Sequence, residues 1–79
     1  MAERILIVED EANIAAPVRA YLERAGFVVD HVLDGRSALE RAAAQQPDLV
    51  LLDLNLPGMD GLEVCRRLRA SSDVPVLML

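Results

Sequence analysis

Runs of consecutive apolar residues alternate along the chain with stretches in which apolar residues recur every three or four positions. Two of these runs, Ile5 to Val8 and Leu49 to Leu52, contain four aliphatic residues each. A strand reads as an unbroken apolar run when both of its faces are buried, as in a parallel sheet. The pattern therefore predicts central strands over residues 4–9 and 48–53.

Helical spacing predicts a helix after each of the first three strands. The first helix covers residues 12–25, and Gly26 follows it as a residue that can end a helix in a left-handed conformation. The second covers residues 35–46, after the capping residue Asp34. Pro47 then prevents this helix from continuing.

The third helix begins at Asp60, which forms an acidic variant of the capping box with Glu63. Each helix should bury one apolar face against the sheet. The residues expected to point inward are Ile14, Val18, Leu22 and Ala25 in the first helix, Leu39, Ala42 and Ala43 in the second, and Leu62, Cys65 and Leu68 in the third.

Two further strands complete the alternation. Residues 27–33 are rich in β-formers but include Asp30 and His31, which suits an edge strand, and residues 74–79 are apolar. The order βαβαβαβ predicts an α/β fold with a doubly wound parallel sheet and helices on both faces. In such sheets the binding site lies at the carboxyl ends of the strands, where the strand order reverses. If the first and third strands are neighbours, the residues that end them meet there.

The composition limits the classes of function. A net charge of −5 on 79 residues argues against nucleic acid as a direct partner, since phosphate binding needs clustered basic residues. The single cysteine, Cys65, excludes an internal disulfide and suits a reducing cytoplasm. No apolar run approaches the roughly 18 residues of a membrane span, so we expect no membrane association.

Both central strands end in acidic residues. Glu9 and Asp10 follow the first, and Asp53 closes the third strand of the chain. Three carboxylates held together raise one another's pKa unless a cation lies between them. Mg²⁺ or Mn²⁺, which prefer oxygen ligands, would resolve the repulsion. We expect Asp10 and Asp53 as direct ligands, Glu9 as a ligand through a water molecule, and the backbone carbonyl of Asn55 as a further ligand.

A carboxylate beside such an ion can also act as a nucleophile and form an acyl phosphate by in-line attack. Simpler roles stay open: Asp53 as a turn former, Asp10 as a helix N-cap and Glu9 as an exposed rim residue. A phosphohydrolase would usually have a second acid two residues after the nucleophile. That position is Asn55, which offers no general acid and therefore disfavours this alternative. A nucleotide- or flavin-binding domain would need a glycine-rich loop after the first strand, and the loop from Glu9 to Asn13 contains no glycine.

Three segments resemble the receiver domain of two-component response regulators: Ile5 to Glu11, Pro47 to Gly61, and Val74 to Leu79. The resemblance covers the whole chain, and its middle segment is the most specific. It implies a flavodoxin-like fold and a signalling module rather than an enzyme. The resemblance is strongest to members that carry a winged-helix DNA-binding output domain, and residues 1–79 include no such domain.

The resemblance also implies roles for individual residues. Asp53 matches the aspartate that accepts a phosphoryl group from a sensor histidine kinase. Glu9 and Asp10 match the acidic pair that holds Mg²⁺ together with Asp53, and Asn55 matches the residue whose backbone carbonyl completes the ligands.

The chain departs from the family pattern because it contains neither Thr nor Lys. Family members carry a Thr or Ser after the fourth strand and a Lys after a fifth, and both contact the phosphoryl group. We therefore expect residues 1–79 to be a partial receiver domain with impaired phosphoryl acceptance. The alternative is a chemically inactive interaction segment. Residues 74–79, as an open edge strand, predict a homodimer or a strand-swapped assembly.

Overall fold

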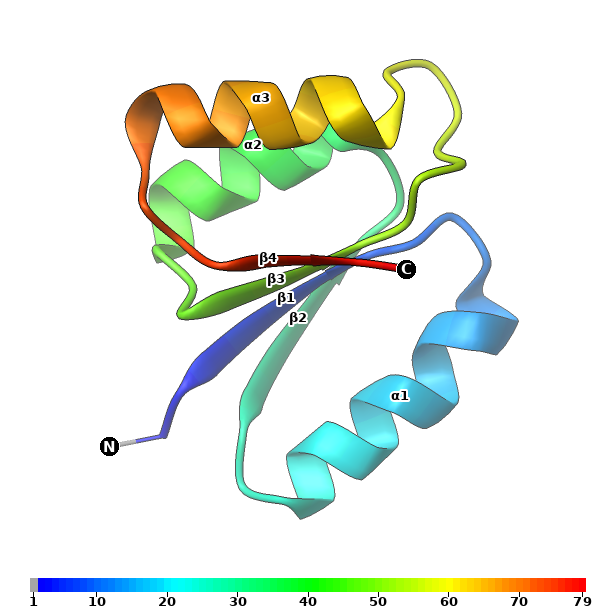
Figure 1. The fold of residues 1–79 in the computed structure, drawn as a ribbon. Helices are drawn as coiled ribbons and strands as arrows, with labels where there is room; N and C mark the ends of the chain where they lie inside the picture. The colour runs from blue at the N-terminus through cyan, green and yellow to red at the C-terminus, as the bar shows by residue number, and fades with distance from the viewer. Residues whose placement is uncertain (1) are drawn as a thin grey trace.

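A computed structural model describes residues 2–79, in which strands and helices alternate strictly (Figure 1). The elements are β1 (Arg4–Val8), α1 (Ala12–Arg24), β2 (Val28–Val32), α2 (Gly35–Gln45), β3 (Leu49–Leu52), α3 (Gly61–Ser71) and β4 (Val76–Met78). Within the described residues, no helix is both long enough and apolar enough to cross a membrane.

The four strands form one parallel sheet in the order β2-β1-β3-β4. The chain adds β2 on one side of β1 and then crosses to add β3 on the other side. The strand order therefore reverses at β1, and the carboxyl ends of β1 and β3 lie side by side at the reversal. This topology confirms the doubly wound fold, the edge position of β2 and the neighbouring central strands.

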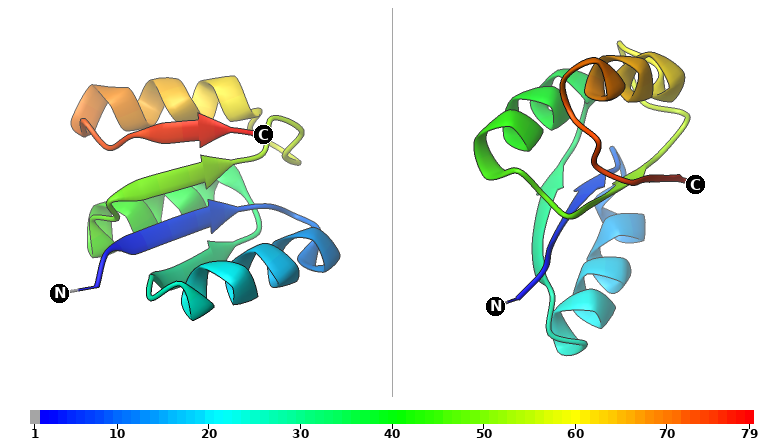
Figure 2. Two further views of the ribbon diagram at one scale, coloured as in Figure 1. Left: turned by 60° about the horizontal axis from the view of Figure 1, so that its bottom comes forward. Right: turned by 60° about the vertical axis from the view of Figure 1, so that its left-hand side comes forward.

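The helices form two layers around the sheet, with α1 on one face and α2 and α3 on the other (Figure 2). Successive strand residues project to opposite faces, so each central strand contributes to both layers. The core under α2 and α3 contains Leu6, Val8, Val50 and Leu52 from the central strands and Ala38, Val64 and Leu68 from the helices. The core under α1 contains Ile5, Ile7, Val29, Leu51 and Ala15.

Two of the predicted helix boundaries have the expected local chemistry. The side chain of Asp34 accepts a hydrogen bond from the backbone N–H of Ser37 at 2.8 Å and caps α2. Gly26 follows α1 with a φ of 102°, a conformation that glycine adopts without steric cost. These observations confirm both boundaries. Both could be predicted from the sequence because the ends of helices depend on residues that are close together in the chain.

The expected inner face of α3 was partly wrong. Leu62 is 68% exposed, whereas Val64 and Leu68 are buried. The capping box is also only half formed. The side chain of Asp60 accepts the backbone N–H of Glu63, but the Glu63 carboxylate pairs with the guanidinium groups of Arg66 and Arg67. Two nearby arginines compete successfully for that carboxylate.

The expected inner faces of α1 and α2 need smaller corrections. Ile14 is 50% exposed and Ala25 is exposed, and the buried residue of α1 is Ala15. In α2, Ala43 is exposed and Ala38 is completely buried. Spacing gave the correct helical period, but the packing of the helices against the sheet decided the phase.

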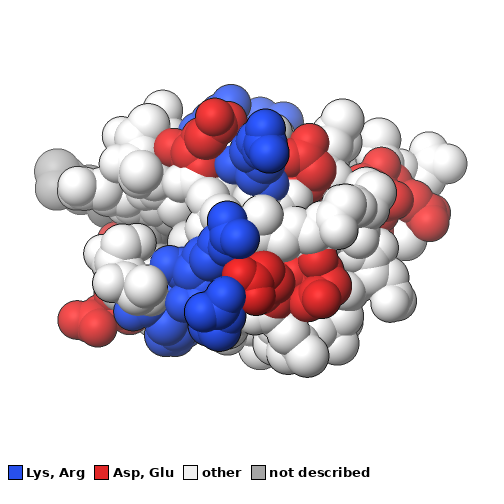
Figure 3. Space-filling model, turned by 90° about the horizontal axis from the view of Figure 1, so that it is seen from above, with Lys and Arg blue, Asp and Glu red and all other residues white. Residues whose placement is uncertain are grey.

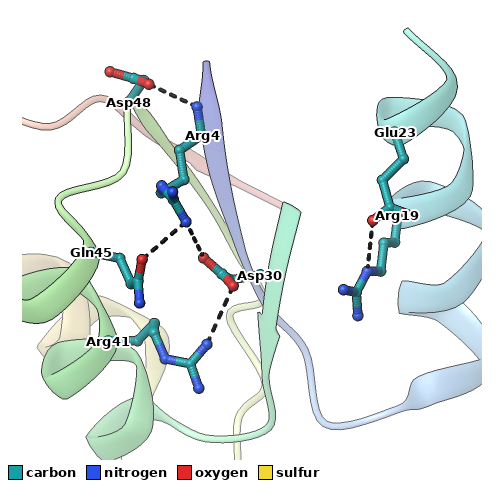
Figure 4. A network of polar contacts seen from close by, with 7 residues as sticks. All are labelled: Arg4, Arg19, Glu23, Asp30, Arg41, Gln45 and Asp48. Atoms are coloured by element: carbon teal, nitrogen blue, oxygen red, sulfur yellow. Dashed lines mark hydrogen bonds and ion pairs between the residues drawn. The ribbon is translucent and has the colours of Figure 1, made fainter. Parts of the chain in front are cut away.

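Charged residues of the sheet and α2 form a network at the amino end of β1 (Figure 4). Asp30, in the edge strand β2, pairs with Arg4 and Arg41 at 3.4 Å each. Arg4 also donates to the side chain of Gln45 at 2.9 Å, and its backbone N–H donates to Asp48 at 2.7 Å. The network explains how an aspartate is accommodated in the sheet beside the aliphatic residues of β1.

The outer face formed by α2 and α3 carries both basic and acidic side chains (Figure 3). Glu63 pairs with two arginines of its own helix, at i+3 and i+4. Intrahelical pairs of opposite charge are typical of a solvated helix face.

Candidate functional site

The carboxyl ends of β1 and β3 bring Glu9, Asp10 and Asp53 together. Each of the three offers a carboxylate oxygen, and these oxygens lie within 4.8 Å of one another. The parallel ladder produces this cluster: Val8 pairs with Leu52, and the N–H of Asp53 donates to the carbonyl of Val8 at 3.1 Å. Two acidic segments more than 40 positions apart therefore end at the same point.

Asp53 is held by the loop that follows it. Its Oδ1 accepts a hydrogen bond from the backbone N–H of Asn55 at 3.0 Å, which turns the chain away from the sheet. Behind it, the N–H of Gly61 donates to the carbonyl of Leu54 at 3.3 Å. The side chain of Asp53 remains partly exposed at the rim of the sheet. The Asp53 carboxylate is thus ordered by the loop and still accessible.

Glu9 is the buried member of the cluster, with only 7% of its surface exposed. Its Oε2 is fully buried and has no hydrogen-bond partner. When Glu9 is ionised, a buried carboxylate oxygen without a donor is costly, because it has lost its hydration and accepts no hydrogen bond in exchange. A cation among the three carboxylates would supply the missing interaction, so the donor set fits a hard divalent ion that prefers oxygen ligands.

The buried carboxyl group of Glu9 and the partly exposed carboxyl group of Asp53 affect each other's protonation. A hydrogen bond with Asp53, burial, and the charges of Asp53 and Asp10 together raise the pKa of Glu9 to about 7, from an ordinary 4.5. The hydrogen bond with Glu9 lowers the pKa of Asp53, and a second hydrogen bond, from the backbone N–H of Asn55, lowers it further. Below about pH 7 and without a cation, Glu9 therefore keeps its proton while Asp53 is ionised.

We expect divalent cations to bind about tenfold more tightly at pH 8 than at pH 6, because Glu9 must lose its proton when the ion binds. Isothermal titration with Mg²⁺ at the two pH values measures this difference. In the metal-free protein, the free energy of unfolding should instead fall as the pH rises. The stabilisation from protonated Glu9 is fully present below about pH 4.5 and is lost as the pH rises through 7.

The matched control for this expectation is Glu9→Gln, which keeps the size of the side chain and removes its titration. Binding by this variant should depend much less on pH between 6 and 8. Equal affinity of the unsubstituted protein at both pH values would contradict the assignment of the titrating group to Glu9.

The structure distinguishes the two roles considered for Asp10, which are N-cap of α1 and member of the acidic cluster. The N-cap of α1 is Glu11, whose side chain makes no capping hydrogen bond, so the expectation that Asp10 caps this helix is wrong. Asp10 is exposed, and its carboxylate contributes to the acidic cluster instead. Asn55 lies beside the cluster, with its N–H bonded to Asp53. Its backbone carbonyl as a metal ligand stays a prediction.

A cavity of about 360 Å³ opens next to the three carboxylates. Its polar end is formed by the acidic cluster and Asn55, and its apolar side lies between α1 and β3. The apolar lining includes Ile14, Ala15, Val18, Leu51 and Leu79. Ile14, which was expected in the core, thus stands at the rim of this cavity.

Two residues at the site were not assigned to it from the sequence. Nε2 of His31 lies 2.8 Å from the backbone carbonyl of Glu9. Gly61 packs so closely on the main chain of Asp53 and Leu54 that a Cβ atom would lie 2.8 Å from each of them. A glycine at the start of a helix is a weak signal of such an approach, and the sequence carries no signal of the His31 contact.

Comparisons with known proteins agree with one another. The family model described as response regulator receiver domain matches residues 5–79. The chain is 49% identical over 79 residues to the DNA-binding response regulator MtrA of Mycobacterium tuberculosis, covering all of this chain and 35% of that protein. It is 49% identical over 75 residues to the transcriptional regulatory protein CseB of Streptomyces coelicolor, covering 95% of this chain and 32% of that protein.

Solved structures of similar proteins have the same fold. The chemotaxis response regulator CheY4 of Vibrio cholerae superposes with a TM-score of 0.94 at 33% identity, covering 99% of this chain and 68% of that one. The BeF3-activated N-terminal receiver domain of RstA from Klebsiella pneumoniae gives a TM-score of 0.92 at 38% identity, covering 96% and 65%. The chain spans about a third of the length of the curated relatives it matches.

Proposed function

Because the chain belongs to the response regulator receiver domain family, we propose that Asp53 accepts a phosphoryl group from a sensor histidine kinase. Receiver domains are generally signalling modules without enzymatic activity of their own, and they typically use Mg²⁺. We propose that Asp10 and Asp53 bind Mg²⁺ or Mn²⁺ directly, that Glu9 binds it through a water molecule, and that the backbone carbonyl of Asn55 is a further ligand.

The observation that carries this proposal is an accessible Asp53 held beside two further carboxylates at the strand-order reversal. A carboxylate oxygen of Asp53 forms the new O–P bond while the N–P bond to the imidazole of the kinase breaks. No general base is needed, because the pKa of Asp53 is lowered and the side chain is already ionised. A bound divalent cation supplies positive charge to the oxygens of the transferring group.

Incubation with Mg²⁺ and a small-molecule phosphodonor, followed by measurement of the intact mass, tests the proposal. One added phosphoryl group supports it. An unchanged mass favours the alternative that residues 1–79 are a chemically inactive interaction segment. We expect slow acceptance, since the sequence has neither Thr nor Lys to contact the phosphoryl group. A phosphohydrolase is disfavoured by Asn55, which stands where a second acid would act.

The open edge of β4 supports a homodimer or a strand-swapped assembly. Pro75 and Leu79 bond to β3, so the intervening Val76 and Met78 direct their own N–H and carbonyl groups outward. Beside this edge, Leu77 and Leu79 are 54% and 64% exposed. Unpaired backbone next to exposed aliphatic side chains favours pairing with another strand.

We therefore expect a concentration-dependent dimer in sedimentation equilibrium, and we expect Leu77→Lys to weaken it about tenfold or more by placing charge at the shared edge. The matched control is Leu62→Lys, which changes another exposed leucine, on α3 and away from β4. A monomer at millimolar concentration, or equal effects of the two substitutions, would argue against association through β4.

For the whole protein we propose the role that the names of its relatives state, which is regulation of transcription by DNA binding. The receiver part would pass the phosphorylation signal to a separate DNA-binding part and would not itself contact nucleic acid. We also propose a cytoplasmic location, which is where a sensor kinase would deliver the phosphoryl group.

A further inference from the structure

We propose that His31 is a positioning residue for the acidic cluster: its ring N–H holds the main chain of Glu9 and thereby maintains the spacing of the carboxylates that bind the divalent cation. The inference rests on the proposed function, because it concerns the same cation site. His31 touches neither the reacting atoms nor the cluster's carboxylates, so it acts through Glu9.

The contact is a hydrogen bond with a defined direction. Nε2 of His31 lies 2.8 Å from the backbone oxygen of Glu9. A carbonyl oxygen can only accept, so Nε2 must carry the proton and donate. His31 pairs with Ile7 in the register of β1 and β2, which places its side chain on the face of the sheet that α1 covers. The ring is partly buried there, which shields the bond from water.

The bond extends the β1–β2 pairing one residue beyond the strand. The N–H of Glu9 donates to the carbonyl of Val32 at 3.1 Å, which is the last backbone bond between the two segments. In a regular parallel ladder the next donor would be the N–H of Asp34. Asp34 instead leaves the sheet to cap α2, and the imidazole of His31 donates to the backbone carbonyl of Glu9 in its place. Both sides of the Glu9 main chain are thus tied to β2.

This tie matters because the segment between β1 and α1 has little else to hold it. Glu11, the N-cap of α1, makes no side-chain capping bond. Asp10 is exposed, and the buried Oε2 of Glu9 has no partner. When all three carboxylates are ionised, as cation binding requires, their mutual repulsion drives this segment away from Asp53. A fixed Glu9 carbonyl opposes that motion and keeps the oxygens preorganised for a cation.

The test compares His31→Val, which suits an edge strand but cannot donate, with His31→Gln, whose amide can donate to the same carbonyl. Mn²⁺ affinity is measured from the electron paramagnetic resonance signal of the free ion, and thermal midpoints are measured without metal. We expect His31→Val to weaken Mn²⁺ binding about tenfold with little change in the metal-free midpoint. His31→Gln should restore most of the affinity.

The outcomes distinguish a failure of the role of His31 from a failure of the proposed divalent-cation site. No Mn²⁺ binding by the unsubstituted protein would overturn both. Normal Mn²⁺ binding by the unsubstituted protein and by His31→Val would overturn only the role of His31. Equal losses in His31→Val and His31→Gln would show that the hydrogen bond is not the cause. A lower midpoint with unchanged affinity would assign His31 a purely structural role.

Discussion

Replacing Asp53 with Asn should abolish phosphorylation of this chain by a small-molecule phosphodonor in the presence of Mg²⁺. The amide of Asn has no anionic oxygen, so it cannot form the acyl phosphate. Its carbonyl oxygen can still accept the N–H of Asn55, so the turn after β3 is preserved. The measurement is the intact mass, in which the peak with one added phosphoryl group should disappear.

The matched control is Asp60→Asn, which removes one carboxylate from the same loop. Asn is as good an N-cap as Asp, so α3 should keep its start and the variant should be labelled normally. Labelling of Asp53→Asn at the rate of the unsubstituted protein would show that the phosphoryl group is carried elsewhere. Loss of labelling in both variants would point to a general effect of charge.

The second large effect is expected for Gly61→Ala, at the first residue of α3. The added Cβ would lie 2.8 Å from the carbonyl oxygen of Asp53 and 2.8 Å from the Cα of Leu54. Both contacts are with main chain, so no side chain can rotate to relieve them. We expect a loss of about 2 kcal/mol in the free energy of unfolding, as for other overpacked sites. The gain in helix propensity, about 1 kcal/mol, offsets only part of the strain.

The same substitution should also slow phosphorylation, because relieving the contact moves the main chain of the acceptor itself. Gly58→Ala separates this effect from loss of stability. Gly58 has a φ of 79° and open space around it, so alanine there costs about 1 kcal/mol of conformational strain without pressing on Asp53. Urea denaturation and labelling rates of the two variants provide the test. Equal labelling rates would refute a mechanical link between Gly61 and Asp53.

Much of the fold follows from patterns that are local in sequence. The aliphatic runs before Glu9 and Asp53 predict buried parallel strands, because only a strand covered on both faces can be apolar at every position. Asp34 and Gly26 mark helix ends through bonds and dihedral angles within a few residues. The alternation of strands and helices then leaves few topologies, and the predicted one is observed.

The errors from the sequence concern choices that local energies barely distinguish. Leu62 and Val64 both fit a helical period, and only contact with the sheet buries Val64. Asp10 and Glu11 are both possible N-caps, and the path of the chain out of β1 selects Glu11. Glu63 could bond to the helix end or to an arginine, and it pairs with Arg66 and Arg67. Such alternatives differ by about 1 kcal/mol or less, so tertiary packing decides them.

For the candidate site, the sequence by itself determined that acidic residues end two buried strands, and that those strands are parallel. Only the tertiary structure decided that Glu9 is buried with an unpartnered oxygen, that His31 holds its main chain, and that Gly61 presses on Asp53. The physical reason is distance along the chain. A cap or a helical period joins residues a few positions apart, whereas these contacts depend on the register of strands and on the packing of a helix against a loop.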